Sequence, residues 1–412
     1  MKSDHFTVSI EEAREIILNM IKPLGFENVS IIEAYNRVLY EDIVSNIMLP
    51  PLDDSAMDGY AVIADDTKGA TKDNPIILNV IGEIQAGFSS RNLKVVNGTA
   101  IRIMTGAHIP EGADAVVKFE DTEEDKGFVK LFREATRYEH YRFAGESIKK
   151  GDCVLQKGDR LNSADVGILA SLNHNRVKVY KQPSVSIIST GDELADIGDE
   201  IQFGQIRNVN AYTLSSEVRK YGIIPHYLGI VKDNPEDTKT IFLEALKSDV
   251  VISTGGVSMG RYDFVKEIYK DLDIEVKFEW IKVKQGRPCT FGTKKDTLIF
   301  GLPGNPVSTL TSFIQFVRPA LLCLMGAKRI KKPVVNAILE EDINKKPGRA
   351  YLLRGYFTIK NNEFYVSTTG NQKSSVLRSM SDANCLIRIP EDVTKMRAGE
   401  RATIELIEHG EI

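Results

Sequence analysis

Two stretches of the chain place hydroxyls, glycines and acids where a hydrophobic strand is expected to end. SVSIISTGDEL closes on the triplet 189–191 and runs into Glu193, and DVVISTGGVSMG closes on the triplet 253–255 and is followed by Asp263. In an α/β sheet, ligands bind beyond the carboxyl ends of the strands. Glycine-rich turns let backbone N–H groups approach a phosphate, and magnesium prefers a few carboxylates together with phosphate oxygens. The pattern predicts a phosphate-bearing substrate handled with magnesium, for which Glu193 and Asp263 are suitable ligands.

Two further loops are expected at the same edge of the sheet. The segment 284–288 supplies the cations Lys284 and Arg287, and GLPGNP ends at Pro306, which suits the first turn of a helix. Each feature has an ordinary alternative when taken singly: a glycine-rich turn that only satisfies backbone geometry, or a charged side chain in solvent. Four such loops on one sheet, with acids and bases interleaved, favour a binding site.

A second dense string of acids lies in the N-terminal half of the chain. PPLDDSAMDGY carries three aspartates, the last of which is Asp58, and RIMTGA places Thr105 at another expected strand end. Prolines stiffen a loop, so the string favours a fixed presentation of carboxylates. The alternative is a solvated turn.

The elements that must position these residues follow from the spacing of apolar residues. Strands and helices alternate from about residue 184 to residue 324, which predicts a parallel, doubly wound sheet. Ser9 and Glu12 form a capping box, so a helix is expected to begin there and to stop before Pro23. Short β-type runs between residues 50 and 141 predict a mostly β module, and the return of such runs after Pro333 predicts a separate β domain.

Composition excludes several classes of protein. The chain has 412 residues, enough for two to four domains, and its formal net charge of −4 predicts no general affinity for nucleic acid or membrane. Its four cysteines are far apart, which fits a reducing cytoplasm, and the start of the chain lacks the apolar core of a signal peptide. There is no GxxxxGK[ST] loop, no GxSxG elbow and no metal-binding histidine spacing.

Several motifs, taken in this order, resemble one family nearly end to end: the molybdopterin molybdenumtransferases, which include bacterial MoeA and the gephyrin E domain. The motifs are PPLDDSAMDGYAV, RIMTGAHIP, STGDEL, STGGVSMGRYDF, GLPGNPVS and TTGNQKSSVLRSMSDANCLI. The resemblance implies a multidomain α/β plus β fold, in which a doubly wound molybdopterin-binding-type domain is joined to an inserted, mostly β module and a small C-terminal β-barrel-like domain. The implied boundaries are 1–50 with 142–180 for a linking and dimerisation domain, 51–141, 181–328 and 329–412.

The resemblance also implies the reaction and the partners. Adenylylated molybdopterin and molybdate would give molybdenum cofactor and AMP, with magnesium, in a cytoplasmic homodimer. Each active site would lie between the α/β domain of one subunit and the β module of the other. The adenylyltransferase that supplies the intermediate is a candidate partner, whereas nucleic acid and membrane are not expected.

The resemblance further assigns roles to single residues. Five are expected to be catalytic, of which Glu193 and Asp263 also bind the metal: Asp58, Thr105, Glu193, Asp233 and Asp263. Others are expected to line the pterin and phosphate pocket: Ser253, Gly255, Gly256, Ser258, Pro303, Gly304, Asn305 and Pro306. Four more match positions that resemble the molybdate site: Lys284, Arg287, Arg354 and Ser375.

The chain departs from the family pattern at two places. The family often reads KPGKP where this chain has Lys284 to Pro288 as KQGRP, so the donor geometry toward an oxyanion changes. A common GED reads Gly-Glu-Ser here, with Ser147 at the third position, so that segment is not expected to bind a cation.

Three alternatives stay open. They are a molybdopterin adenylyltransferase, a non-catalytic scaffold like the gephyrin E domain, and a tungstate-specific paralogue. With no attached domain or long linker at either end, the chain is expected to be the biosynthetic enzyme.

Overall fold

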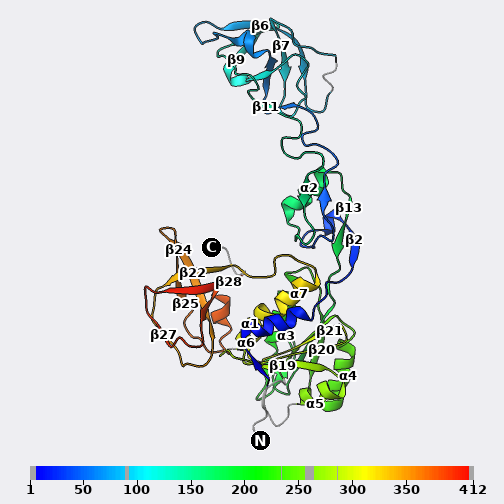
Figure 1. Ribbon diagram of the computed structural model, residues 1–412, viewed down its shortest axis with the longest axis vertical. Helices are drawn as coiled ribbons and strands as arrows, with labels where there is room; N and C mark the ends of the chain where they lie inside the picture. Colours follow the sequence, from blue (N-terminus) through cyan, green and yellow to red (C-terminus); the bar gives the residue numbers. More distant parts are fainter. Residues whose placement is uncertain (1–5, 89–91, 233, 256–263, 285, 408–412) are drawn as a thin grey trace. The chain divides into compact units, whose positions relative to one another are not determined.

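The computed structural model describes residues 6–88, 92–232, 234–255, 264–284 and 286–407. The chain forms two compact units whose elements are labelled in Figure 1. Unit 1 comprises Met1–Glu41, Lys157–Gly167 and Asn175–Ile412, and unit 2 comprises Asp42–Gln156 and Ile168–His174.

A seven-stranded sheet forms the centre of unit 1, in the order β1-β19-β20-β21-β18-β14-β17. The strands, in that order, are Thr7–Val8, Glu275–Ile281, Pro288–Lys294, Thr297–Leu302, Val250–Thr254, Val185–Thr190 and His226–Val231. The four strands β17, β14, β18 and β21 are parallel, as predicted.

The sheet departs from the predicted parallel arrangement at β20, which runs antiparallel to both of its neighbours. Lys294 pairs with Thr297, so only two residues connect β20 to β21, and the first of them, Lys295, has a φ of 54°. Two-residue hairpin turns usually have glycine or asparagine where φ is positive, but the two residues of this turn are lysine and aspartate. The sequence therefore lacked the usual hairpin signal.

Helices cover both faces of the sheet, which confirms the doubly wound arrangement. On one face, Ile187 and Ile252 share an apolar cluster with residues of α1, α3 and α7, and on the other Ile188 and Val251 share one with residues of α4 and α5. Successive strand residues point to opposite faces, which explains the nearly continuous apolar runs of these strands. The helices are α1 Ile10–Asn19, α3 Val209–Arg219, α4 Pro235–Ala245, α5 Phe264–Asp271, α6 Pro306–Ser312 and α7 Arg318–Leu324.

Two predictions about helices are confirmed. Ser9 and Glu12 form the predicted capping box of α1, which ends before Pro23. A π-helical segment, Phe313–Val317, joins α6 to α7 into one helix from Pro306 to Leu324. This helix is long and apolar enough to cross a membrane, but 94% of its most apolar window is buried inside the protein, where it forms part of the core.

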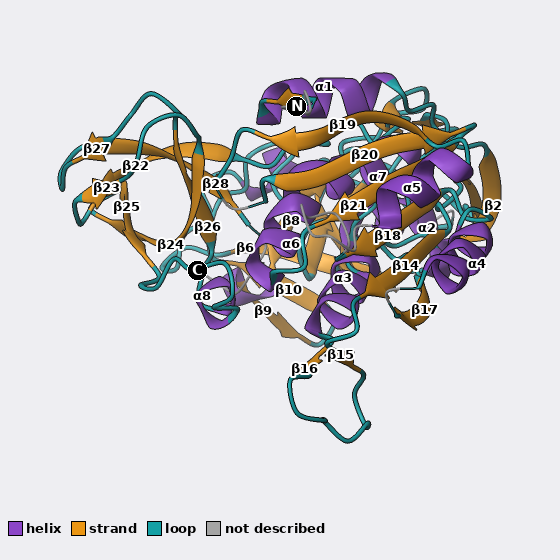
Figure 2. Cartoon of the chain, turned by 90° about the horizontal axis from the view of Figure 1, so that it is seen from below, coloured by secondary structure: helices purple, strands orange, loops and turns teal. Residues whose placement is uncertain are grey.

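The C-terminal part of unit 1 is a closed barrel in the order β22-β25-β24-β26-β28 (Figure 2), which confirms the predicted β domain. Its strands are Val334–Leu339, Glu363–Thr368, Tyr351–Lys360, Cys385–Ile389 and Arg401–Leu406. Along β24, Tyr351 and Leu353 face the barrel core, whereas Leu352 belongs to the core of the α/β domain. The two-residue period therefore turns the side chain of Arg354, like that of Leu352, out of the barrel.

Unit 2 contains the predicted, mostly β module. Its six-stranded sheet has the order β8-β5-β7-β6-β10-β9, with apolar clusters on both faces. The strands are Ala115–Lys118, Gly59–Val62, Thr99–Ile103, Ile76–Ile84, Phe128–Leu131 and Thr122–Asp125. Shorter ladders pair β4 (Asp54–Ser55) with β11 (Tyr141–Arg142), and β3 (Ile43–Val44) with β12 (Cys153–Leu155).

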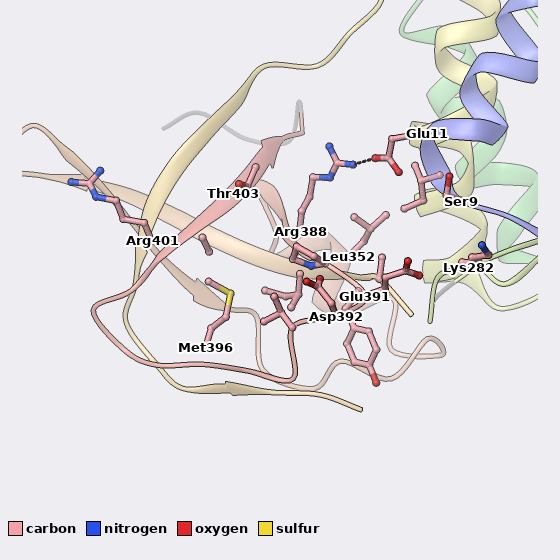
Figure 3. A pocket seen from close by; sticks show the side chains of 17 residues that line it. Ser9, Glu11, Lys282, Leu352, Arg388, Glu391, Asp392, Met396, Arg401 and Thr403 are labelled. Carbon is pink, nitrogen blue, oxygen red and sulfur yellow. Dashed lines mark hydrogen bonds and ion pairs between the residues drawn. The ribbon is translucent and has the colours of Figure 1, made fainter. Parts of the chain in front are cut away.

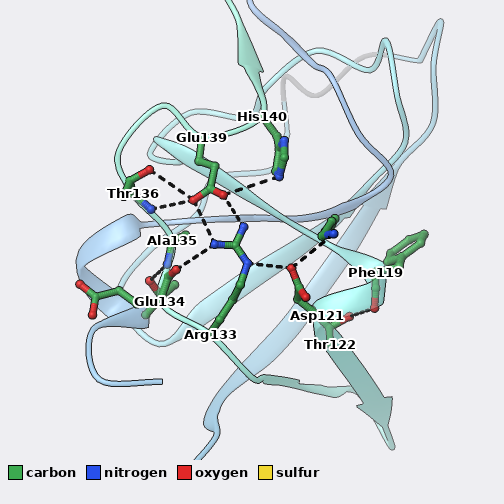
Figure 4. A network of polar contacts seen from close by, with 11 residues as sticks. Phe119, Asp121, Thr122, Arg133, Glu134, Ala135, Thr136, Glu139 and His140 are labelled. Carbon is green, nitrogen blue, oxygen red and sulfur yellow. Dashed lines mark hydrogen bonds and ion pairs between the residues drawn. The ribbon is translucent and has the colours of Figure 1, made fainter. Parts of the chain in front are cut away.

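A polar network in unit 2 centres on Arg133 (Figure 4). Its Nε donates to Asp121 Oδ2 at 2.7 Å, its Nη2 donates to Glu139, and Glu139 Oε2 also accepts from the backbone N–H of Thr136 at 2.9 Å. Burial opposes ionisation of Glu139, but the hydrogen bonds from Arg133 and Thr136 outweigh it and lower its pKa.

Replacing Arg133 by glutamine is expected to destabilise unit 2 by about 1 kcal/mol at pH 7. Charge-assisted hydrogen bonds can be worth more than this, but the Arg133 side chain is 35% exposed, so solvent screens its interactions. Because the pKa of Glu139 is lowered on folding, its contribution is present above its ordinary value of 4.5 and is lost as the pH falls below it. The variant should therefore lose part of that acid sensitivity. Amide exchange of unit 2 peptides at pH 7 and below pH 4.5 measures both effects. Arg137→Gln, which removes a more exposed cation, is the control, and an equal effect of both variants would contradict the prediction.

Candidate active site

The two Ser-Thr-Gly strand ends lie side by side in unit 1. β14 and β18 are parallel neighbours, with Ser189 opposite Thr254. Thr190 Oγ1 donates to the carbonyl of Thr254 at 3.3 Å, and Thr254 Oγ1 donates to Ser189 Oγ at 3.4 Å. The prediction that the two turns share one edge of the sheet is confirmed.

A pocket of about 370 Å³ opens at this edge. All four predicted loops contribute to it, and the 284–288 loop does so only through Pro288. The lining residues are Thr190, Glu193, Leu194, Ile206, Asn210, Thr254, Gly255, Pro288, Pro303, Gly304 and Asn305. The antiparallel β20 explains the position of the fourth loop, because the connection from β19 to β20 lies at the same end of the sheet as the end of β21.

Gly255 is fixed by a close approach of two backbones. Its φ is +88°, and a Cβ atom on it would lie 2.4 Å from the carbonyl oxygen of Thr190. Its N–H donates to the carbonyl of Leu302 at 3.2 Å, so the turn is tied to both neighbouring strands. A side chain here would push the β14 and β18 ends apart.

Gly255→Ala is therefore expected to destabilise the protein by about 2–4 kcal/mol, the range of substitutions that combine backbone strain with a steric clash. Gly304→Ala is the matched control for stability, because its Cβ would meet only the Cα of Gly255 at 3.9 Å, an ordinary contact. Equilibrium unfolding in urea compares the two variants. Equal stability of both would contradict the proposed role of Gly255.

Glu193 lies at the mouth of the pocket with an exposed side chain. Its carboxylate lies over Gly191, because a Cβ placed on that glycine would be 2.5 Å from Glu193 Oε2. One exposed carboxylate beside this pocket would suit magnesium, which takes one or two carboxylates and otherwise phosphate oxygens and water. Among the described residues, no cluster of three or more histidines, cysteines or acids could hold a metal without such additional ligands.

Four predicted residues lie outside the part of the chain that the structure describes: Asp233, Gly256, Ser258 and Asp263. The others in the α/β domain are described. Ser253 is fully buried, and its Oγ has no hydrogen-bond partner among the described residues. Pro306 occupies the first turn of α6, as predicted, and Asn305 is the N-cap residue but makes no capping bond with its side chain. One N–H of this turn is already used, because Val307 donates to the carbonyl of Ser374 in the C-terminal domain at 3.2 Å.

The structure separates the two cations of the 284–288 loop. Lys284 is exposed, its N–H donates to the carbonyl of Ala350 at 3.0 Å, and its Nζ lies 4.7 Å from the centre of the Tyr351 ring. Arg287 instead stacks on Trp280, with Cζ 4.7 Å from the ring centre. Lys284 therefore faces the barrel domain, whereas Arg287 packs on its own hairpin.

Arg354 is a fully buried cation on the outer face of the barrel. Its guanidinium donates to Ser379 Oγ at 3.1 Å and to the carbonyls of Asn371 and Lys373, both at 3.2 Å. Its Nη1 has no partner among the described residues, and burial lowers its pKa to about 10, so it stays charged at neutral pH. Ser375 is exposed in the loop that this arginine holds.

In unit 2, the structure brings Asp58 and Thr105 together. Asp58 Oδ1 accepts hydrogen bonds from the N–H of Thr105 at 2.7 Å and from its Oγ1 at 2.8 Å, which lower the pKa of the exposed carboxyl. The two other acids of the same string hold the chain together: Asp53 accepts from Tyr141 and Asp54 accepts from Arg142. Of the three acids, Asp58 alone combines a fixed carboxylate with an exposed position.

Sequence reasoning missed Asn210, which lines the pocket from the first turn of α3. Its Nδ2 donates to the carbonyl of Gly304 at 2.7 Å, and its buried Oδ1 has no partner among the described residues. The only signal was the helix start itself, because Asn208 caps α3 and so places Asn210 next to the strand ends.

A larger pocket, of about 530 Å³, lies where the start of α1 and Lys282 meet the barrel (Figure 3). Arg388 and Glu11 form an ion pair across it. None of the predicted site residues that the structure describes lines this pocket. The volume of a pocket therefore does not identify the site of the predicted residues.

Comparison with known proteins agrees with this geometry. Residues 8–173 match the MoeA N-terminal region (domain I and II), 186–322 a probable molybdopterin binding domain, and 336–407 the MoeA C-terminal region (domain IV). Proteins named molybdopterin molybdenumtransferase from Staphylococcus epidermidis and Staphylococcus aureus are each 35% identical, over 97% of this chain and 96% of theirs. The molybdopterin biosynthesis MoeA protein of Pyrococcus horikoshii OT3 superimposes with a TM-score of 0.81, at 33% identity, over 97% of this chain and 100% of that one. The chain belongs to the MoeA family of molybdopterin molybdenumtransferases.

Proposed function

We propose that this enzyme inserts molybdenum from molybdate into adenylylated molybdopterin and hydrolyses the adenylylate, releasing molybdenum cofactor and AMP. The observation that carries the proposal is the buried Arg354, a charged group whose Nη1 has no partner, and whose desolvation no counter-ion offsets, among the residues that the structure describes. A buried unpaired charge is costly, and an oxyanion oxygen beside Nη1 would supply both the missing acceptor and the missing charge.

The position of Arg354 favours this reaction over simple adenylyl transfer. The strand-end pocket alone would suit any phosphate-bearing pterin, because it offers glycines and hydroxyls of the α/β domain and no described residue of the barrel lines it. Arg354 and Ser375 belong to the barrel domain, which provides a cation that pterin adenylylation does not require. Lys284, which lies against Tyr351 of the same barrel, is the second cation proposed for the oxyanion.

We assign the remaining roles as follows. The Ser253–Gly255 turn, with Gly256 and Ser258, and the Pro303–Pro306 loop hold the pterin and its phosphates. Glu193 and Asp263 are the proposed magnesium ligands, and magnesium would neutralise charge on the phosphate oxygens as the phosphoanhydride bond breaks. Asp58, Thr105 and Asp233 complete the proposed catalytic set, and Arg287 is an outer cation of the oxyanion site.

The proposal extends to the assembly of the enzyme. We infer a cytoplasmic homodimer in which Asp58 and Thr105 of one subunit complete the site of the other. The linking and dimerisation domain would comprise residues 1–50 and 142–180. The other proposed domains are the β module 51–141, the α/β domain 181–328 and the barrel 329–412. Family membership supports this division, and the adenylyltransferase that makes the intermediate is the proposed supplier.

The test is an assay of the purified protein with adenylylated molybdopterin, magnesium and molybdate. AMP release that depends on molybdate is expected. If the protein released no AMP in this assay but adenylylated molybdopterin from ATP, it would be an adenylyltransferase. If it showed neither activity, it would be a scaffold. Adding tungstate in competition distinguishes a tungstate-specific enzyme, which would release AMP faster with tungstate than with molybdate.

A further inference from the structure

The loop that follows Glu193 is closed at its neck by two short paired strands. β15 (Leu194–Ala195) and β16 (Ile206–Arg207) run parallel, and Figure 2 shows the chain leaving at the first and returning at the second. The N–H of Ile206 donates to the carbonyl of Glu193 at 2.7 Å, and the N–H of Asn208 donates to that of Ala195 at 2.9 Å. The backbone of Glu193 is therefore part of this neck.

Asp196, the first residue beyond β15, ties the neck to the α/β domain. Its Oδ1 accepts from the hydroxyl of Tyr212 on α3 at 2.5 Å, and its Oδ2 accepts from the hydroxyl of Tyr227 on β17 at 2.9 Å. Its carbonyl accepts from Arg207 Nη1 at 2.5 Å, across the two strands of the neck. One carboxylate thus joins the loop to a helix and to a strand of the sheet.

A chain of hydrogen bonds continues from Tyr227 to the two Ser-Thr-Gly strand ends. Asn208 Nδ2 donates to Tyr227 Oη at 2.8 Å, Ser189 Oγ donates to Asn208 Oδ1 at 3.2 Å, and Thr254 Oγ1 donates to Ser189 Oγ. Ser189, Thr254 and Asn208 are almost fully buried. Every donor in this chain points toward Asp196, and such aligned bonds strengthen one another in a low-dielectric interior.

The chain requires an acceptor with two oxygens at its end. Each tyrosine donates to a different oxygen, so an N–H₂ group in place of either oxygen could not accept and would lose one of the two bonds. Burial opposes ionisation of Asp196, but the bonds from Tyr212 and Tyr227 outweigh it and lower its pKa. The carboxylate is thus the form that the surroundings of residue 196 stabilise.

We propose that Asp196 is a positioning residue that holds Glu193 at the pocket, by anchoring the neck of its loop to Tyr212 and Tyr227. This inference rests on the proposed role of Glu193. It adds a residue that does not line the pocket, and it explains how both strand ends and Glu193 keep one fixed arrangement.

The test compares Asp196→Asn and Tyr227→Phe with Glu200→Gln, a charge-matched change of an exposed acid in the same loop. Amide exchange of a peptide that covers residues 194–208 is measured for each full-length variant. Because the neck loses an anchoring bond, exchange is expected to be about tenfold faster in the first two variants, while β14 and α3 stay protected. The Glu200→Gln loop should exchange as in the unmodified protein.

AMP release is measured on the same samples as a function of magnesium. Asp196→Asn is expected to need about tenfold more magnesium for half-maximal rate, with a smaller change in KM for the pterin. Faster exchange without any change in the magnesium dependence would overturn the positioning role, and so would unchanged exchange. Absence of AMP release from the unmodified protein would instead refute the proposed function, while the exchange comparison would still show whether Asp196 holds the neck.

Discussion

Glu193→Gln is expected to lower molybdate-dependent AMP release by about 100-fold or more, the scale on which a positioned acidic group contributes to catalysis. The substitution keeps the size of the side chain and removes its charge. Because the carboxylate is exposed and lies over Gly191 at the mouth of the pocket, the loss of charge should leave folding unaffected. The measurement is single-turnover AMP release at saturating magnesium, with thermal unfolding recorded in parallel.

Glu200→Gln serves as the control for this prediction. It removes the same charge from an exposed position of the same loop, but it does not line the pocket. The control should release AMP at the unmodified rate. If Glu193→Gln also kept the full rate, Glu193 would have no part in catalysis or metal binding.

Arg354→Lys is expected to raise the molybdate concentration needed for half-maximal insertion by about 10–100-fold. Lysine keeps the charge but cannot reproduce the planar set of donors that binds Ser379 and two carbonyls and still leaves Nη1 for an anion. The KM for the pterin should change much less, since the strand-end pocket belongs to another domain. Titration of molybdate at fixed pterin measures the two effects separately.

Arg401→Lys is the matched control, because it makes the same change on another barrel strand, where Arg401 pairs with Glu363 at 2.6 Å in an exposed position. It should leave the molybdate dependence unchanged. A uniform loss of rate in Arg354→Lys, with no change in the molybdate concentration required, would point to misfolding of the 371–375 loop and would contradict direct oxyanion binding.

The edge of the sheet could be predicted because its signals are local. Glycines with hydroxyls after an apolar strand mark a turn at the carboxyl end, and alternation of strands with helices places such turns together. The structure confirms this for the 189–191 and 253–255 triplets, which share hydrogen bonds, and for the 303–305 loop, which completes the pocket. The mostly β module and a separate C-terminal β domain were predicted for the same reason, since period-two patterns and turn residues are local, whereas the barrel form was implied by the family resemblance.

The features that escaped prediction depend on pairing over long distances. β20 forms a hairpin with β21 through a turn that lacks glycine and asparagine, so only the tertiary sheet reveals its direction. Arg354 was assigned to the molybdate site only through the family resemblance, and no local pattern predicted that its side chain is fully buried on the outer face of the barrel. Asn210 bonds to Gly304, and Asp196 bonds to Tyr212 and Tyr227. These partners are distant in the sequence, so no local spacing pattern predicts the contacts.

AMP release and molybdenum insertion are proposed to be one coupled reaction at the strand-end pocket. A single-turnover reaction of the unmodified enzyme, with AMP and pterin-bound molybdenum measured in the same samples, tests this coupling. Both products should appear together in equal amounts, neither should appear without molybdate, and Glu193→Gln should slow both alike. AMP released at full rate without molybdate, or without molybdenum in the pterin product, would contradict it.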